Sequence, residues 1–277
     1  MQPGLPQVPA ASDGVMFDPL QLFGLFVLAL VAGTIDAMAG GGGLLTIPGL
    51  MATGLPPVTA LATNKFQAIF SPLSAAWHFW KSGRLPVLKL WKPALFAMIG
   101  SACGAASLTF INPGVLRNLV PFFLMAICGW LLLSDDLGKE PATARMRFSM
   151  FAVSVVPLIA FYDGFFGPGT GTFFAMSMVA LTGLALDQAT MQAKLYNFMS
   201  NLGALIFFLF TGHIVWIIAI VMACGMVTGG AVGARLVLKH GTGLIKPLLI
   251  VTSLAMSVRL LWQNGTLAAW AKAMGLH

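Results

Sequence analysis

Charged residues are scarce in this chain, and their scarcity excludes an ordinary soluble domain. Only 8% of the 277 residues are charged, whereas 58% are hydrophobic. Soluble domains carry about 25% charged residues. The composition therefore predicts a membrane protein that has the lipid bilayer as its surroundings. The net charge of +7 does not indicate a nucleic-acid partner, because the cations are shared among loops that flank apolar runs.

Cysteine and histidine are too few and too scattered to form a metal site or a disulfide framework. The three cysteines show no CxxC spacing and the four histidines no HExxH motif. The chain also lacks a Gly-x-Ser-x-Gly elbow, and its glycine run lacks the Gly-Lys-Ser/Thr ending of a nucleotide-binding loop. We expect no cofactor, no metal and no enzymatic activity. We expect the cysteines to be small buried apolar residues.

Long apolar runs are what the chain does contain. A membrane-spanning helix needs about 20 apolar residues. The long runs cover residues 20–39, 58–80, 88–111, 115–133, 148–166, 187–210, 214–238 and 244–262, and two runs of half that length cover 44–53 and 172–182. The first run follows Asp13 and Asp18 with no Lys or Arg before it, so we expect a retained helix rather than a cleaved signal. The predicted fold is an all-α polytopic membrane protein with eight long and two short membrane segments.

The two halves of the chain repeat one unusual pattern of an acid, a glycine-rich turn and a lysine. Asp36 and Gly40 match Asp163 and Gly167 at an offset of 127 residues, whereas Lys65 matches Lys194 at an offset of 129. A two-residue insertion in the second glycine turn would explain the difference. We therefore divide the chain into an N-terminal repeat (1–133), a polar linker (134–147) and a C-terminal repeat (148–277). Repeats with interrupted apolar segments are typical of secondary transporters.

The loop cations predict the orientation of the repeats. They cluster around residues 81–92, in the linker and around 235–246, and the positive-inside bias makes these loops cytoplasmic. Each half then crosses an odd number of times and the repeats are inverted, provided that the short segments count as crossings. If both short segments are re-entrant, eight crossings remain and the cations near residue 81 fall outside.

Two lysines stand in apolar sequence at matched positions, Lys65 and Lys194. A charge in the hydrocarbon region costs about 2.5–3.5 kcal/mol on insertion scales, unless it finds a partner or a wet cavity. Lysines near helix ends commonly extend to the nearer surface. The duplication in register with the glycine turns favours a site inside the membrane instead.

The residues around the lysines supply further hydrogen-bonding groups. Glycine turns leave backbone N–H groups free at a helix N-terminus, where an anion binds well. Nearby amides act either as ligands or as contacts between helices. The predicted substrate-binding residues are Lys65, Lys194, Asn64, Thr63, Gln67, Gly41, Gly42, Gly43, Gly169, Thr170, Gly171, Asn197 and Asn201. Asp36 and Asp163 either carry protons, hold a lysine in place or cap the turn that follows. We expect other glycines, such as Gly100, Gly104, Gly229 and Gly233, to serve close helix packing.

Three segments of the chain resemble the sulfite exporter TauE/SafE family. They are residues 33–48 (GTIDAMAGGGGLLTIP), residues 62–65 (ATNK), and residues 161–169 (FYDGFFGPG) with Ala193-Lys194 and Ser200-Asn201. The resemblance covers nearly the whole chain and implies a bacterial inner-membrane transporter of small sulfur-containing anions, such as sulfite or organosulfonates, with export as the expected direction. It is closest to members without an assigned substrate.

Our interpretation is a secondary transporter that binds a small anion between the repeats and moves it by alternating access. An anion channel would use the same residues, and saturable, gradient-coupled flux would distinguish the two. An intramembrane enzyme or a lipid-binding factor would need a reactive constellation that the sequence does not show. Assembly as a homo-oligomer is left open.

Overall fold

The computed structural model describes residues 18–108 and 143–241, together with residues 245, 247, 248, 250, 251 and 254. Every regular element in these residues is helical, which confirms the all-α class. The predicted segment 115–133, most of the linker and most of segment 244–262 lie outside the described residues.

The helices fall into two sets that match along the chain. In order they are α1 (Pro19–Ala39), α2 (Gly43–Ala52), α3 (Pro57–Gln67), α4 (Phe70–Lys81), α5 (Val87–Ser107), α7 (Phe148–Phe165), α8 (Thr170–Ser177), the π-helix η1 (Met178–Thr182), α9 (Leu186–Thr211) and α10 (Trp216–His240). Of these, α1, α7, α9 and α10 are long and apolar enough to cross a membrane. Large apolar side chains such as Leu88 and Phe210 are exposed on the outside of the helices, as expected of a surface that faces lipid.

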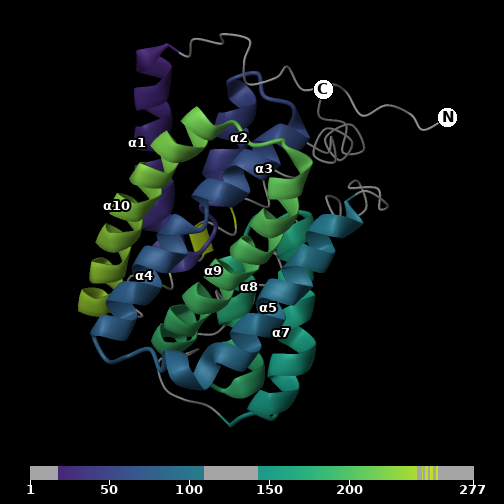
Figure 1. The fold of residues 1–277 in the computed structure, drawn as a ribbon. Helices are drawn as coiled ribbons and strands as arrows, with labels where there is room; N and C mark the ends of the chain where they lie inside the picture. The colour runs from purple at the N-terminus through teal and green to yellow at the C-terminus, as the bar shows by residue number, and fades with distance from the viewer. Residues whose placement is uncertain are drawn as a thin grey trace, which may run out of the picture.

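Each short helix turns back beside the long helix before it. In Figure 1, α1 descends from the upper end of the molecule to its middle, and α2 returns towards the upper end. The pair α7 and α8 does the same from the lower end. Each short helix therefore brings the chain back towards the end of the molecule at which the preceding long helix began.

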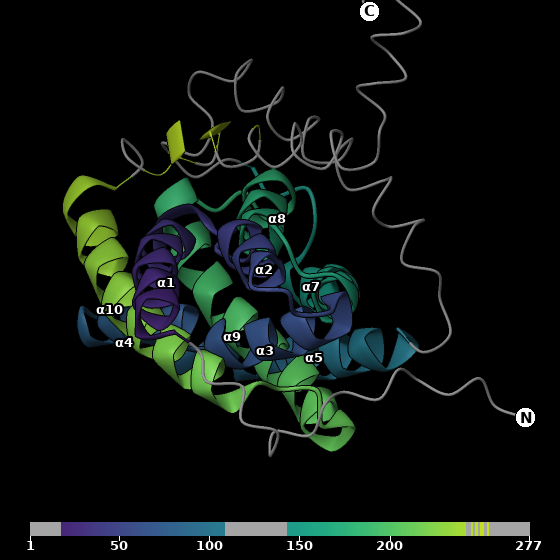
Figure 2. The same ribbon diagram turned by 90° about the horizontal axis from the view of Figure 1, so that it is seen from above.

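The halves are intertwined rather than separate. α1 packs along α10 of the other half, and α5 packs along α7 (Figure 2). Glycines allow these contacts: a Cβ on Gly104 would lie 2.0 Å from the carbonyl oxygen of Phe161, and one on Gly229 would lie 2.2 Å from that of Leu30. The predicted packing role of these glycines is confirmed. In Figure 1, α5 rises through the molecule and α10 descends, although the two helices occupy matching positions in their halves.

One predicted long segment is broken in the structure. The run 58–80 forms two helices, α3 and α4, with a turn at Ala68 and Ile69. Pro72 favours a break here, because it has no N–H to donate to the carbonyl of Ala68 and is well suited to the first turn of a new helix, although α5 and α7 continue through Pro93 and Pro157. Asn201 occupies the matching position in the second half, and α9 runs through it without interruption.

The two-residue insertion lies at a different place from the predicted one. The offset of 127 persists through the second glycine turn, since Gly40 and Gly167 both have positive φ angles and α2 and α8 begin at Gly43 and Thr170. Glycines with positive φ after the short helices, Gly54 and Gly183, match at 129. The insertion therefore falls between Thr170 and Gly183, where the chain forms the π-helix. A π-helix accommodates extra residues within a helix, commonly near functional sites.

The cysteine prediction was wrong for two of the three residues. Cys103 and Cys224 are free thiols on exposed helix faces, and Cys128 lies outside the described residues. Outward faces of a membrane protein are apolar, so a small apolar residue is as suited to them as to the interior.

Candidate functional site

The two glycine turns meet backbone to backbone in the middle of the molecule. A Cβ on Gly40 would lie 2.6 Å from the backbone nitrogen of Thr172, and one on Gly171 would lie 2.9 Å from the Cα of Gly40. The Thr172 hydroxyl donates a hydrogen bond of 3.0 Å to the carbonyl of Ala39. Only residues without a side chain permit this approach. The repeated glycines therefore bring the two half-sites into one place.

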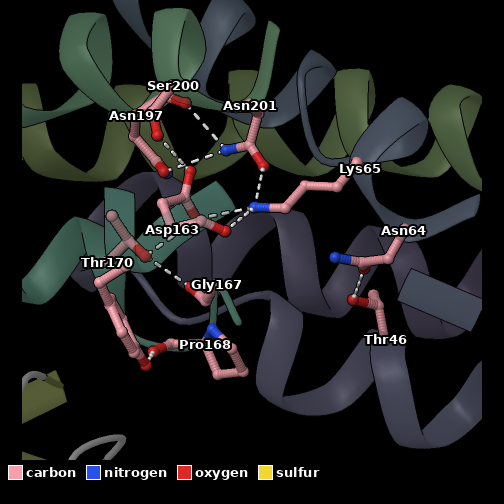
Figure 3. Close-up of polar contacts among 11 residues, drawn as sticks. Thr46, Asn64, Lys65, Asp163, Gly167, Pro168, Thr170, Asn197, Ser200 and Asn201 are labelled. Carbon is pink, nitrogen blue, oxygen red and sulfur yellow. Dashed lines mark hydrogen bonds and ion pairs between the residues drawn. The ribbon is translucent and has the colours of Figure 1, made fainter. Parts of the chain in front are cut away.

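Lys65 crosses from the first half to the second half and pairs with Asp163. Its Nζ lies 2.9 Å from Asp163 Oδ1, and the two side chains are only 1% and 2% exposed. The same Nζ donates to the carbonyl of Asp163 and, at 3.3 Å, to Asn201 Oδ1 (Figure 3). Gly167 makes room for the ammonium, because a Cβ there would lie 3.0 Å from Nζ. This is the only ion pair among the residues that the structure describes.

Lys194 extends from the second half to the first half, but it binds a backbone carbonyl rather than a carboxylate. Its Nζ donates to the carbonyl of Asp36 in the first half. The side chain is only 1% exposed, so neither lysine extends to a membrane surface. A Cβ on Gly171 would lie 3.4 Å from this Nζ, which places the ammonium beside the second glycine turn.

Each aspartate is also held by a serine of its own half. Ser71 donates to Asp36 Oδ2 at 3.0 Å, and Ser200 donates to Asp163 Oδ2. Asp36 Oδ1 accepts the backbone N–H of Gly42 at 3.3 Å, so this aspartate caps the first turn. Asp163 Oδ1 instead accepts from Lys65 and from the Thr170 hydroxyl, each at 2.9 Å. The two aspartates therefore differ: one caps a turn and the other holds a lysine.

A small cavity lies between the turns. Its volume is about 30 Å³, and since one water needs about 10–15 Å³ on this measure, it has room for about two waters but not for a sulfonate. It is lined by Asp36, Gly41, Gly42, Gly43, Asn64, Lys65, Ala68, Asp163, Gly167, Gly169, Thr170, Gly171, Asn197, Asn201 and Met226. Most of the predicted binding residues are therefore gathered around one small cavity.

The other predicted residues lie beside the cavity rather than in its wall, and they are Lys194, Gln67 and Thr63. Gln67 donates a 2.6 Å hydrogen bond to Asn64 Oδ1, which also accepts from the Thr46 hydroxyl at 2.6 Å. These bonds orient Asn64 so that its amide nitrogen points towards Lys65 and Asp163 (Figure 3). Thr63 accepts the backbone N–H of Val215 at 3.1 Å. Gln67 therefore supports the site through Asn64, whereas Thr63 joins α3 to the turn before α10.

Sequence reasoning left several contributors out of the predicted set, among them Thr46, which holds Asn64, and Met226, which lines the cavity. Ser71 and Ser200 orient the aspartates, Gly167 makes room for Lys65, and Ala68 lines the cavity at the helix break. The serines match at the same offset as the lysines, so the repeat carried a signal for them. The sequence carried no such signal for Ala68, because its place in the cavity wall follows from the helix break near Pro72, four residues later.

Helices with apolar outer faces and buried charges at their centre define a polytopic membrane protein that handles a polar solute. Residues 25–260 match the model of the family described as sulfite exporter TauE/SafE, so the chain belongs to this family. It is a multi-pass transporter of the bacterial inner membrane and not an enzyme.

Similar proteins are named as probable membrane transporters, and their names give no substrate. "Probable membrane transporter protein YfcA" of Escherichia coli (strain K12) is 41% identical over 249 residues, covering 90% of this chain and 93% of the relative. "Probable membrane transporter protein" of Haemophilus influenzae is 38% identical over 241 residues, covering 87% and 94%. "Probable membrane transporter protein YunE" of Bacillus subtilis is 23% identical over 270 residues, covering 87% and 97%. No solved structure matches the chain.

Proposed function

We propose that the protein is a secondary transporter of small sulfur-containing anions, with its binding site between the two glycine turns. The observation that carries the proposal is that both glycine turns and Lys65 line one small cavity, while the buried Lys194 lies beside the second turn. A solute that binds between the two repeats, in the middle of the molecule, can be exposed first to one face of the membrane and then to the other as one repeat moves against the other. The site would thus serve alternating access.

The arrangement of the helices supports inverted repeats that are divided by the linker (134–147). Matching helices run in opposite directions in Figure 1, and the basic ends of α4 and α10 lie at the same end of the molecule as the start of α7. A cavity of about 510 Å³ at the start of α7 is lined by Lys89 and Arg147 among others. Cations that line a surface cavity raise the local concentration of anions there. We place this end in the cytoplasm.

Thiols introduced at the two ends should therefore react from opposite sides of the membrane. In a variant without the three native cysteines, we expect Ser82→Cys and Ala144→Cys to be labelled only from the cytoplasm, and Thr211→Cys only from the periplasm. Labelling of intact cells against everted vesicles with a membrane-impermeant maleimide measures this. Labelling of Ser82→Cys and Thr211→Cys from one side would contradict the inverted arrangement.

A carrier fits the site better than a channel does. The Lys65–Asp163 pair and the contact between Gly40 and Gly171 close the route through the middle of the molecule. A channel needs a continuous path and ion sites weak enough to release the ion quickly. Flux that saturates with anion concentration in proteoliposomes would support the carrier, and flux that stays linear would favour the channel.

The donors in the site favour anions with several oxygens. The ammonium of Lys65 and the hydroxyls of Thr170 and Ser200 now serve the carboxylate of Asp163. A sulfite or sulfonate group offers three oxygens to these donors and to the amide of Asn64, and charge-assisted hydrogen bonds are about twice as strong as neutral ones. Chloride is a single spherical ion and has no separate oxygen atoms that could accept hydrogen bonds from these donors.

Thermal-shift or calorimetric titration of the purified protein tests the anion preference. We expect sulfite and isethionate to stabilise the protein at lower concentrations than chloride does, with sulfate and a long-chain carboxylate as comparison anions. Lys239→Met, on the exposed end of α10, should respond as the unaltered protein does. If chloride or the long-chain carboxylate were the tightest ligand, the proposed site chemistry would be wrong.

A further inference from the structure

We propose that Asp163 is the site of a co-transported proton, and that an anion binds only when this carboxyl group is protonated. The inference rests on the proposed function, because it concerns the same cavity. Asp163 occupies the donors that an incoming anion needs: Lys65 at 2.9 Å, Thr170 at 2.9 Å and Ser200 on the other carboxylate oxygen. The carboxylate thus stands in the place of a substrate anion.

The charges of the site lead to the same conclusion. Two lysines and two aspartates make it neutral as it stands, and all four side chains are 7% exposed or less. An anion that entered unaccompanied would leave a net negative charge in a water-poor interior, where uncompensated charge is costly. One proton taken up with each monovalent anion keeps the site neutral. Protonation also releases Lys65 from its ion pair and leaves it free to bind the anion.

The surroundings single out Asp163 rather than Asp36. No described lysine side chain hydrogen-bonds to the carboxylate of Asp36, which caps the Gly42 N–H and accepts from Ser71. Protonating Asp36 would therefore break no direct ion pair with a described lysine. The other titratable or charged groups near Asp163 are Lys194 on α9, Asp36 on α1 and the neighbouring Tyr162, whose hydroxyl donates to the carbonyl of Pro168. From α5 and α8, the groups that approach this part of α7 are Ser101, Ala105 and Thr170.

The coupling bears on the direction of transport. A monovalent anion and a proton move together without net charge, so the membrane potential exerts no force on the pair. The direction then follows the anion and proton gradients, and a cell interior more alkaline than the outside drives uptake. Export occurs when the anion gradient exceeds the opposing proton gradient.

Proton uptake on anion binding tests the inference directly. Purified protein in weakly buffered solution is titrated with isethionate, whose charge is fixed across the pH range used. We expect about one proton to be taken up per anion and the affinity to fall about tenfold per pH unit while Asp163 is ionised in the free protein. This measurement does not depend on any variant folding.

Variants assign the proton to its residue. In Asp163→Asn we expect isethionate to bind without proton uptake and with an affinity that no longer depends on pH, whereas Asp187→Asn, at the partly exposed start of α9, should keep both. Binding with no proton uptake in the unaltered protein, or uptake that survives in Asp163→Asn, would overturn the inference and leave the anion site standing. Failure of sulfite and isethionate to bind at any pH would overturn the proposed function as well.

Discussion

Replacing Lys65 with Met is expected to abolish anion binding and also to destabilise the fold. The substitution removes the cation that lines the cavity and leaves the Asp163 carboxylate buried without its ion-pair partner. Breaking a buried pair in this way costs about 3–5 kcal/mol. Thermal unfolding in detergent measures the stability, and isethionate titration measures the binding. Lys239→Met is the matched control, since the same change on the exposed end of α10 removes no buried partner.

The double variant Lys65→Met with Asp163→Asn separates the two effects. It removes both charges of the pair, so most of the lost stability should return, because no buried charge is left unpaired. Anion binding should stay absent, since the ammonium is still missing. If the double variant were no more stable than Lys65→Met alone, the pair would not be the source of the destabilisation. If either variant bound isethionate as the unaltered protein does, Lys65 would lie outside the anion site.

The repeat pattern in the sequence predicts which residues of the two halves lie close together. The duplicated acid, glycine turn and lysine predicted one shared site, and the structure brings most of the predicted residues around one cavity. These residues lie together because a buried lysine that recurs in register with a glycine turn needs a partner at the same depth; that they bind an anion stays a prediction. The glycines predicted to pack helices lie in close helix contacts for a similar reason, because the absence of a side chain matters most where two backbones approach each other.

Other features could not be read from the pattern because they depend on which residues meet across the halves. The two lysines are equivalent in sequence, yet Lys65 pairs with a carboxylate and Lys194 with a backbone carbonyl. The repeat treats the two lysines alike, whereas the structure predicts a larger stability cost for the loss of Lys65, because only Lys65 forms an ion pair among the residues that the structure describes. The break after α3 also depends on a local difference between the repeats, Pro72 against Asn201. It places Ala68 in the cavity wall of the first half alone.

The asymmetry of the lysines leads to a second large effect, at Lys194. Lys194→Met should abolish anion binding while leaving the protein folded. The ammonium of Lys194 donates to the carbonyl of Asp36, so its loss leaves one buried acceptor without that donor, at a cost of about 1–3 kcal/mol. No direct ion pair is broken, because Lys194 bonds to the backbone carbonyl of Asp36, and the carboxylate keeps its bonds to Gly42 and Ser71, so the charge imbalance acts on the site as a whole.

Binding fails in this variant for an electrostatic reason. With Lys194 gone, two aspartates face one lysine, and the site is negative before any anion arrives. An anion would then need two protons rather than one to leave the site neutral. Isethionate titration and flux in proteoliposomes measure the loss, with thermal unfolding as the check on folding and Lys239→Met as control. Unaltered affinity in Lys194→Met would show that the second half contributes no cation to the anion site. Unfolding as severe as that of Lys65→Met would show instead that Lys194 balances a buried carboxylate.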